Sequence, residues 1–417
     1  MPRTHVRPST HVWPRTHVCR PLLGLLAAGL LALSACSAPT VVSSDASADP
    51  MAGMSGMSAT PGPDDTAHAG TVQGNPLPGM PPILDPNDLY AADRPNALAS
   101  VVRGDVARVY VPNHASNTVS VVDPATNKVI ETHQVPVGPE HVVPSWDLRT
   151  LWVNSDTSNY LTPIDAATGR FGTPVPVSDP YNLYFTPDGK FAVVMAEREH
   201  QIVFRDPHTM AVHKVVPVHC DGVNHADFSP DGRYFIASCE FSGELLKVDT
   251  VKQEIIGQQH IPASHPMPQD VKIAPDGKTW YVADMQSSGV WILNGDTFGV
   301  PTFLPTGAGA HGLYITRDSK RMYISNRGEG SISIFEFASH SLVAKWQIPG
   351  GGSPDMGGVS ADGKVLWLSG RYHRVVYALD ANDGHLIAKI QTGGEPHGLC
   401  VWPQPGRYSL GHTGILR

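Results

Sequence analysis

The strongest constraint on the fold of this chain is a turn motif that recurs every 41 to 45 residues. In each copy an apolar segment leads into an aspartate-containing turn, and a second apolar segment follows. The turns lie at Asp147-Leu148, Asp188-Gly189, Asp231-Gly232, Asp276-Gly277, Asp318-Ser319 and Asp362-Gly363, and a diverged seventh copy ends at 403–406. Asp-Gly turns suit tight β-hairpins. A fixed period near forty with four strand-like segments per unit is typical of a β-propeller.

The two ends of the repeat region complement each other. Residues 108–113, 118–123 and 128–131 have the pattern of strands two, three and four without a first strand, whereas residues 398–402 have that of a first strand alone. Joined, they make one composite blade that closes the ring and leaves no exposed sheet edge. The sequence therefore predicts an all-β, seven-bladed propeller over residues 87–417, with four antiparallel strands per blade. The tail 407–417 lies beyond this closure and has no predicted role.

Several segments resemble the YVTN-repeat propeller family. They are Tyr110-Val-Pro-Asn113, Asn117-Thr-Val-Ser-Val-Val-Asp123 and Pro396-His397-Gly398, together with the repeated Pro-Asp-Gly turns. The resemblance spans about residues 106–405 and implies the propeller fold. Its implication for function is broad, because such propellers include surface proteins, binding proteins and relatives of several enzymes.

The first 35 residues are predicted to be a bacterial lipoprotein signal peptide. Arginines precede a short apolar run at 22–33, which is the pattern of a secretory signal and is too short for a membrane anchor. The run ends in Leu33-Ser34-Ala35-Cys36, which resembles a lipobox. The resemblance implies that Cys36 carries lipid. The protein is thus expected to be exported and anchored to the outer face of the cell membrane, or to an outer membrane if the host has one.

Residues 36–86 are rich in Gly, Pro, Ser, Ala and Met and are predicted to be a flexible tether. Met51, Met54 and Met57 occur within it at regular spacing, and thioether sulfurs suit Cu(I). The alternative is a low-complexity linker that happens to contain methionine. The formal net charge is -8 and the presumed mature part has no basic run, which argues against nucleic acid as a partner.

Residues with ligand or acid-base chemistry recur where each first strand begins, at one mouth of the central channel. Aligned by their turns, the seven pairs are Glu140-His141, Tyr181-Asn182, Asn224-His225, Gln269-Asp270, His311-Gly312, Asp355-Met356 and His397-Gly398. Adjoining loops add Arg198, Arg327 and Arg371, which either clamp an anionic ligand or pair with acids on a solvated rim. Each histidine is either a structural residue of the repeat or a metal ligand or base.

One blade gathers the most reactive groups. Its hairpin register is expected to place His225 opposite Ser238 and Cys239 opposite Asn224. Three alternatives follow for Cys220 and Cys239: a disulfide, which an exported protein permits; a copper or zinc site with His225; or two buried small residues.

Three functions are compatible with these features. The first is a non-enzymatic protein that binds a small ligand or a protein partner at the channel mouth. The second is a lactonase- or lyase-type enzyme that uses a mouth histidine and a divalent metal such as zinc. The third is copper handling or metal-centred redox work. Motifs for a phosphate-binding loop, covalent haem or a zinc-protease helix are absent from the sequence.

Overall fold

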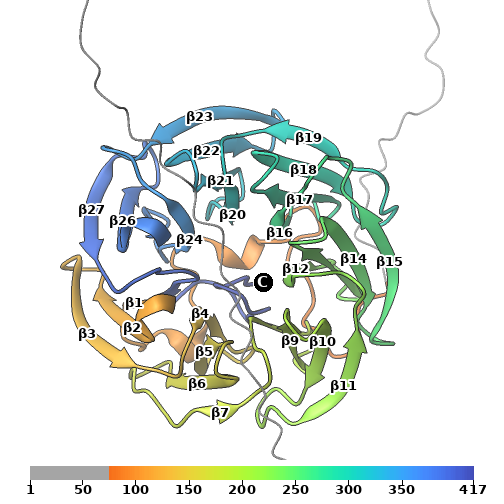
Figure 1. Cartoon of the computed structure of the whole chain (residues 1–417), viewed down its shortest axis with the longest axis horizontal. Coiled ribbons are helices and arrows are strands. Elements are labelled where there is room, and N and C mark those ends of the chain that lie inside the picture. Colours follow the sequence, from red (N-terminus) through yellow and green to blue (C-terminus); the bar gives the residue numbers. More distant parts are fainter. Residues whose placement is uncertain (1–74) are drawn as a thin grey trace, which may run out of the picture. The chain divides into compact units, whose positions relative to one another are not determined.

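The computed structural model describes residues 75–417, and these residues form a ring of seven four-stranded antiparallel sheets (Figure 1). This confirms the predicted all-β, seven-bladed propeller. The predicted signal peptide, Cys36 and the methionines at 51, 54 and 57 lie outside the described residues. Within the described residues, no helix is long and apolar enough to cross a membrane.

The blades follow one another in chain order. The composite blade has β28 (Cys400–Trp402), β1 (Arg108–Asn113), β2 (Thr118–Asp123) and β3 (Lys128–Gln134). The next two have β4 (Pro139–Pro144), β5 (Thr150–Ser155), β6 (Tyr160–Asp165) and β7 (Val175–Pro176), then β8 (Asn182–Phe185), β9 (Ala192–Ala196), β10 (Gln201–Arg205) and β11 (Val212–Pro217). The fourth and fifth have β12 (Val223–Phe228), β13 (Tyr234–Cys239), β14 (Glu244–Asp249) and β15 (Glu254–His260), then β16 (Pro268–Ile273), β17 (Thr279–Asp284), β18 (Gly289–Asn294) and β19 (Thr302–Pro305). The last two have β20 (Ala310–Ile315), β21 (Arg321–Asn326), β22 (Ser331–Glu336) and β23 (Ser341–Gln347), then β24 (Pro354–Val359), β25 (Val365–Gly370), β26 (Val375–Asp380) and β27 (Leu386–Gln391).

Burial falls from the channel to the rim of each blade. Every residue of the inner strand β12 is buried, whereas the outer strand β15 alternates between exposed and half-buried residues. Inner strands are enclosed by neighbouring blades on both faces, so they tolerate polar side chains only where these find partners. The apolar core consists of side chains from adjacent sheets that pack face to face between blades.

The repeated turns are held by the same contacts in different blades. Asp231 Oδ1 accepts hydrogen bonds from Ser229 Oγ at 2.7 Å and from the Arg233 amide at 3.1 Å. Gly232 then takes φ 71°, in the left-handed region that favours glycine. Leu148 and Ser319 occupy the same left-handed position in the diverged turns. The aspartate therefore defines the turn even where glycine is missing.

The ring closes as the sequence predicts, through β1 and β28. Tyr110 pairs with Cys400 and Arg108 with Trp402 in the antiparallel ladder. The indole of Trp402 is buried, and its Nε1 donates to Asp105 Oδ2 at 2.9 Å. The closure thus combines backbone pairing with a buried aromatic side chain.

The chain ahead of β1 packs against the face of the ring that carries the aspartate turns. The amides of Leu77, Leu89 and Asn96 donate to the carbonyls of Asp231, Pro275 and Ala361, which belong to three different turns. This segment ahead of β1 includes the 3₁₀-helices η1 (Ala91–Asp93) and η2 (Ser100–Val102). Two further 3₁₀-helices, η3 (His114–Ser116) and η4 (Arg371–His373), lie at the mouth of the channel. Contacts with the propeller therefore begin ahead of the predicted boundary at 87, because the carbonyl of Asn75 accepts a hydrogen bond from Arg233 Nε and Leu77 is buried.

The tail 407–417 forms a hairpin inside the channel, and Figure 1 shows the C-terminus at the centre of the ring. Leu410 and Ile415 pair across the hairpin, with the Leu410 amide donating to the Ile415 carbonyl at 2.7 Å. Gly411 bridges Tyr184 of β8 at φ 99°, and a Cβ there would lie 2.4 Å from the Leu183 carbonyl oxygen. The hairpin apex therefore fits the channel wall only with glycine at this position.

We expect Trp402→Ala to lower the free energy of unfolding by about 3–5 kcal/mol, because it leaves a cavity where the ring closes. Urea denaturation followed by circular dichroism measures the loss. Phe241→Ala, at a side chain that is 54% exposed, is the control and should change stability by less than about 0.5 kcal/mol. Equal losses in the two variants would contradict the importance of this closure.

Candidate functional site

A β-bulge positions the mouth residues in five of the seven inner hairpins. The bulges carry Glu140, Asn224-His225, Gln269-Asp270, His311-Gly312 and Asp355-Met356, and each adds one residue to the inner strand relative to its partner. A bulge bends the strand and redirects its side chains. The extra residue lets these blades direct polar side chains to the channel. The alternation of apolar side chains between the two faces of the strand continues unchanged beyond the bulge.

The bulge corrects the register predicted for the cysteine-containing blade. Cys239 pairs with Val223, not with Asn224, because the extra residue shifts the ladder. Cys239 forms a disulfide with Cys220, with 6.0 Å between their Cα atoms. The prediction of Cys239 as a metal ligand beside His225 is therefore wrong, because its sulfur is bonded to another sulfur. Cys400 is the free cysteine of the described residues and is buried.

Three histidines form the first cluster at the hub: His141, His225 and His412. One ring nitrogen of each lies within 4.8 Å of the others, and all three side chains are buried. His141 and His225 come from inner strands, whereas His412 lies at the apex of the tail hairpin. The ring of His141 packs so closely on Gly398 that a Cβ there would lie 2.2 Å from its Cδ2.

Hydrogen bonds orient these three rings by their Nδ1 atoms. Nδ1 of His141 donates to the Tyr181 carbonyl at 2.9 Å, which leaves its Nε2 with a lone pair. The Asn182 amide lies between the other two rings, with Nδ2 3.3 Å from His225 Nδ1 and 2.9 Å from His412 Nδ1. None of the three Nε2 atoms has a hydrogen-bond partner. Unpartnered buried nitrogens are unusual and call for an explanation such as an ion.

A carboxylate stands beside this cluster. Oδ1 of Asp270 lies 3.7 Å from His412 Nε2 and has no hydrogen-bond partner, while its Oδ2 accepts from the Leu313 amide at 2.9 Å. Burial raises the pKa of Asp270 to about 6. One oxygen of Asp270 is thus held by the backbone, and the other lies beside His412.

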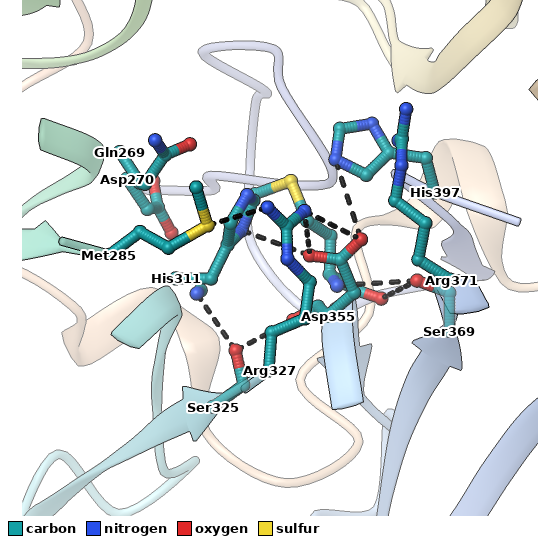
Figure 2. A network of polar contacts seen from close by, with 12 residues as sticks. Gln269, Asp270, Met285, His311, Ser325, Arg327, Asp355, Ser369, Arg371 and His397 are labelled. Atoms are coloured by element: carbon teal, nitrogen blue, oxygen red, sulfur yellow. Dashed lines mark hydrogen bonds and ion pairs between the residues drawn. The ribbon is translucent and has the colours of Figure 1, made fainter. Parts of the chain in front are cut away.

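A second cluster consists of His311, Asp355 and His397, again with ligand atoms within 4.8 Å of one another. Figure 2 shows Asp355 between the two histidines and Arg327. Oδ1 of Asp355 lies 3.2 Å from both His311 Nδ1 and Arg327 Nη1, and its Oδ2 lies 3.7 Å from His397 Nε2. The ring centroids of His397 and His141 are 4.9 Å apart, so the two clusters are adjacent.

Glu140 connects the second cluster to the surface. Its oxygens lie 2.6 Å from both His397 Nδ1 and His114 Nδ1 and 3.1 Å from Arg371 Nη1. Burial by itself raises the pKa of Glu140, but Arg371, His397 and His114 outweigh burial and hold the pKa well below its usual range. Glu140 is therefore a buried carboxylate that stays ionised.

The mouth arginines are paired with acids of the chain. Arg371 binds Glu140, Arg327 binds Asp355, and Arg198 binds Asp179 at 2.8 Å. Of the two alternatives predicted for these arginines, the structure therefore shows pairing with acids of the chain. The carboxylates that they bind are buried, however, and do not lie on a solvated rim. Nη2 of Arg327 also contacts the sulfur of Met285 at 2.6 Å (Figure 2).

The hub imidazoles are neutral at physiological pH. Burial lowers the pKa of His141 to about 3, with a further contribution from His397. Burial likewise lowers the pKa of His225, His311 and His412 well below the usual range, and lowers that of His397 with help from Arg371. Neutral imidazole is the form that binds transition metals.

The structure brings together all ten mouth residues named from the sequence: Glu140, His141, Asn182, His225, Asp270, His311, Arg327, Asp355, Arg371 and His397. It adds His412, which the turn alignment missed because the tail lies beyond the repeat. Leu410 and Ile415 flank the Gly411–Gly414 segment, and this apolar-turn-apolar pattern is the signal that could have identified a hairpin. His219, which precedes Cys220 in the chain, is exposed.

These features define a seven-bladed β-propeller with a histidine-rich hub. Residues 79–405 match the YNCE-like β-propeller family, and the chain belongs to that family. This confirms the resemblance to YVTN-type propellers. No curated protein matches the chain.

Three solved structures that share the fold have low sequence identity to this chain. Hydrazine synthase of Kuenenia stuttgartiensis matches with a TM-score of 0.57 at 19% identity, over 68% of this chain and 97% of that one. A putative 6-phosphogluconolactonase from Bacteroides uniformis has a TM-score of 0.58 at 18% identity, over 71% and 99%. The dihydro-heme d1 dehydrogenase NirN has 0.54 at 14%, over 74% and 79%. At these identities the likeness concerns the fold alone.

Metal-free protein should lose stability as the pH falls below about 6.5. The hub histidines stay neutral when folded but titrate near their ordinary pKa of 6.5 when unfolded, so the unfolded chain binds more protons in this range. Each imidazole that stays neutral contributes a loss of about 1.4 kcal/mol per pH unit. Urea denaturation with chelator at pH 7.5, 6.5 and 5.5 measures the slope. His225→Gln should give a shallower slope, and an unchanged slope would contradict this assignment.

Proposed function

We propose that this protein is an exported, lipid-anchored propeller that binds a transition-metal ion at its hub through His141, His225 and His412. Two observations carry the proposal: three buried neutral imidazoles each bring one ring nitrogen within 4.8 Å of the others, and their Nε2 atoms have no hydrogen-bond partner. A buried polar atom without a partner is costly, so such a cluster without a ligand would destabilise the fold. A metal ion bound by one nitrogen of each ring would use this convergence.

The packing of the hub favours an ion over an organic ligand. The side chains of His141, His225 and His412 are each at most 1% exposed. The arginines that would clamp an organic anion are already paired with Glu140 and Asp355. Our proposal is therefore narrower than the binding function predicted from the sequence, because the proposed ligand is a metal ion.

The ligand set favours zinc or copper. Imidazole binds both ions well. Three histidines with an open fourth position are typical of catalytic rather than structural zinc sites. Asp270 lies beside His412 and supplies negative charge or a fourth ligand. Asn182 Nδ2 faces the Nδ1 atoms of His225 and His412, so metal binding through Nε2 requires this amide to turn and accept from both Nδ1–H groups.

The anchoring part of the proposal depends on the first 36 residues. The lipobox at Leu33–Cys36 would attach the domain to a membrane through Cys36. The methionines Met51, Met54 and Met57 would then lie between membrane and propeller, where thioethers can hold Cu(I). The Cys220–Cys239 disulfide agrees with export, because disulfides persist in oxidising compartments.

His412→Gln is expected to weaken zinc or copper binding by about a hundredfold or more, since losing a ligand should cost at least as much as losing a partner of a ligand. Isothermal titration of chelator-treated protein measures the affinity. His208→Gln, at an exposed histidine, is the matched control and should bind like the wild type. Equal affinity of both variants, or no metal uptake by the wild type, would overturn the proposal.

Cys36→Ala is expected to move the protein from the membrane fraction to the soluble fraction, because the lipid attachment is lost. Fractionation of expressing bacteria with immunoblotting measures the distribution. Ser37→Ala keeps the cysteine and should leave the protein with the membrane. A Cys36→Ala protein that stays in the membrane fraction would contradict lipid anchoring.

A further inference from the structure

We infer that the hub holds a second transition-metal ion, bound by His311, Asp355 and His397, so that the two ions form a two-metal centre. This inference rests on the proposed function for the first ion. The three side chains are at most 2% exposed and offer ligand atoms within 4.8 Å of one another. Two histidines and one carboxylate are a recurrent ligand set for divalent first-row metals.

The protonation of His397 supports this site. Its Nδ1 lies 2.6 Å from Oε2 of Glu140, which is ionised and paired with Arg371, so Nδ1 carries the hydrogen. Its Nε2 then holds a lone pair, has no hydrogen-bond partner and faces Oδ2 of Asp355 at 3.7 Å. Two lone-pair atoms face each other in a buried place without a hydrogen between them. A cation between them would turn this repulsion into attraction.

The surroundings of this cluster match those of known metal ligands. A ligating histidine usually donates its other N–H to a carboxylate, which fixes the ring and raises its basicity. Oε2 of Glu140 lies 2.6 Å from His397 Nδ1, in a position to accept this hydrogen, and Arg371 in turn holds Glu140. Nδ1 of His311 completes the set, lying 3.2 Å from Asp355 Oδ1 without a hydrogen bond.

The two clusters share a wall of imidazole rings. The ring centroids of His141 and His397 are 4.9 Å apart, and those of His225 and His311 are 6.2 Å apart. Each pair takes one ring from each cluster. Ions held by the two clusters would therefore be neighbours, and their electron spins would interact.

The positive charge of Arg327 disfavours a cation at the second site, so replacing this residue tests the site. Its Nη1 lies 3.2 Å from Oδ1 of Asp355, so its charge repels a cation bound to that carboxylate. Asp355 has two oxygens and can keep this contact while it binds a metal. Removing the charge in Arg327→Gln should tighten the second site by about tenfold or more. The first site should be affected less.

The experiment counts ions in full-length protein that is stripped with chelator and then loaded with Zn²⁺ or Cu²⁺. Elemental analysis and native mass spectrometry should find two ions in the wild type and in His208→Gln. They should find one ion in His412→Gln and one in His311→Gln. Circular dichroism checks that each variant is folded, and Asp355→Asn, which keeps the side-chain shape, replaces His311→Gln if the latter fails to fold.

Electron paramagnetic resonance tests that the ions are neighbours. Copper-loaded wild type should give a spin-coupled signal with a half-field transition, and each single-site variant should give the signal of an isolated Cu(II). One ion in the wild type that His311→Gln retains would overturn the second site and leave the first intact. No ion in the wild type would overturn both. A folded His311→Gln protein that binds no ion would overturn the division into two sites.

Discussion

The pairing of β1 with β28 is the constraint on which the rest of this structure depends. It joins the two ends of the repeat region and closes seven sheets into a ring. Without this pairing the inner edge of β1 would be open, and an open strand edge can template aggregation. It also places seven inner strands around one axis, and only there can residues far apart in sequence, such as His141 and His397, become neighbours.

The hub concentrates polar chemistry in a place where a fold usually avoids it. Burying Glu140 and Asp355 is tolerable because Arg371 and Arg327 pair with them. The histidines differ, because several of their ring nitrogens are buried without any partner. This contrast between satisfied carboxylates and unsatisfied imidazoles is the physical basis for assigning metal ions, rather than an anionic ligand, to the hub.

The tail hairpin contributes the third histidine of the first cluster in the channel. Without His412, the first cluster would have two imidazoles from the ring wall and no third ligand. The hairpin is held by backbone pairing with β8 at Gly411 and by Arg417, whose Nη2 donates to buried Asp227 at 2.9 Å. The segment that the repeat pattern left without a role thus supplies a residue on which the proposed function depends.

The sequence by itself determined the fold, because the period of the aspartate turns and the complementary end strands leave few alternatives to a closed seven-bladed ring. It also determined which inner-strand residues face the mouth, since strand starts can be counted from the turns. It could not predict the register at Cys239, because the spacing of the turns does not reveal the extra residue at the Asn224-His225 bulge. Nor could it place His412 or pair Arg371 with Glu140, because such contacts join residues far apart in the chain. Only the tertiary structure decided those contacts, because they exist only once the ring has closed.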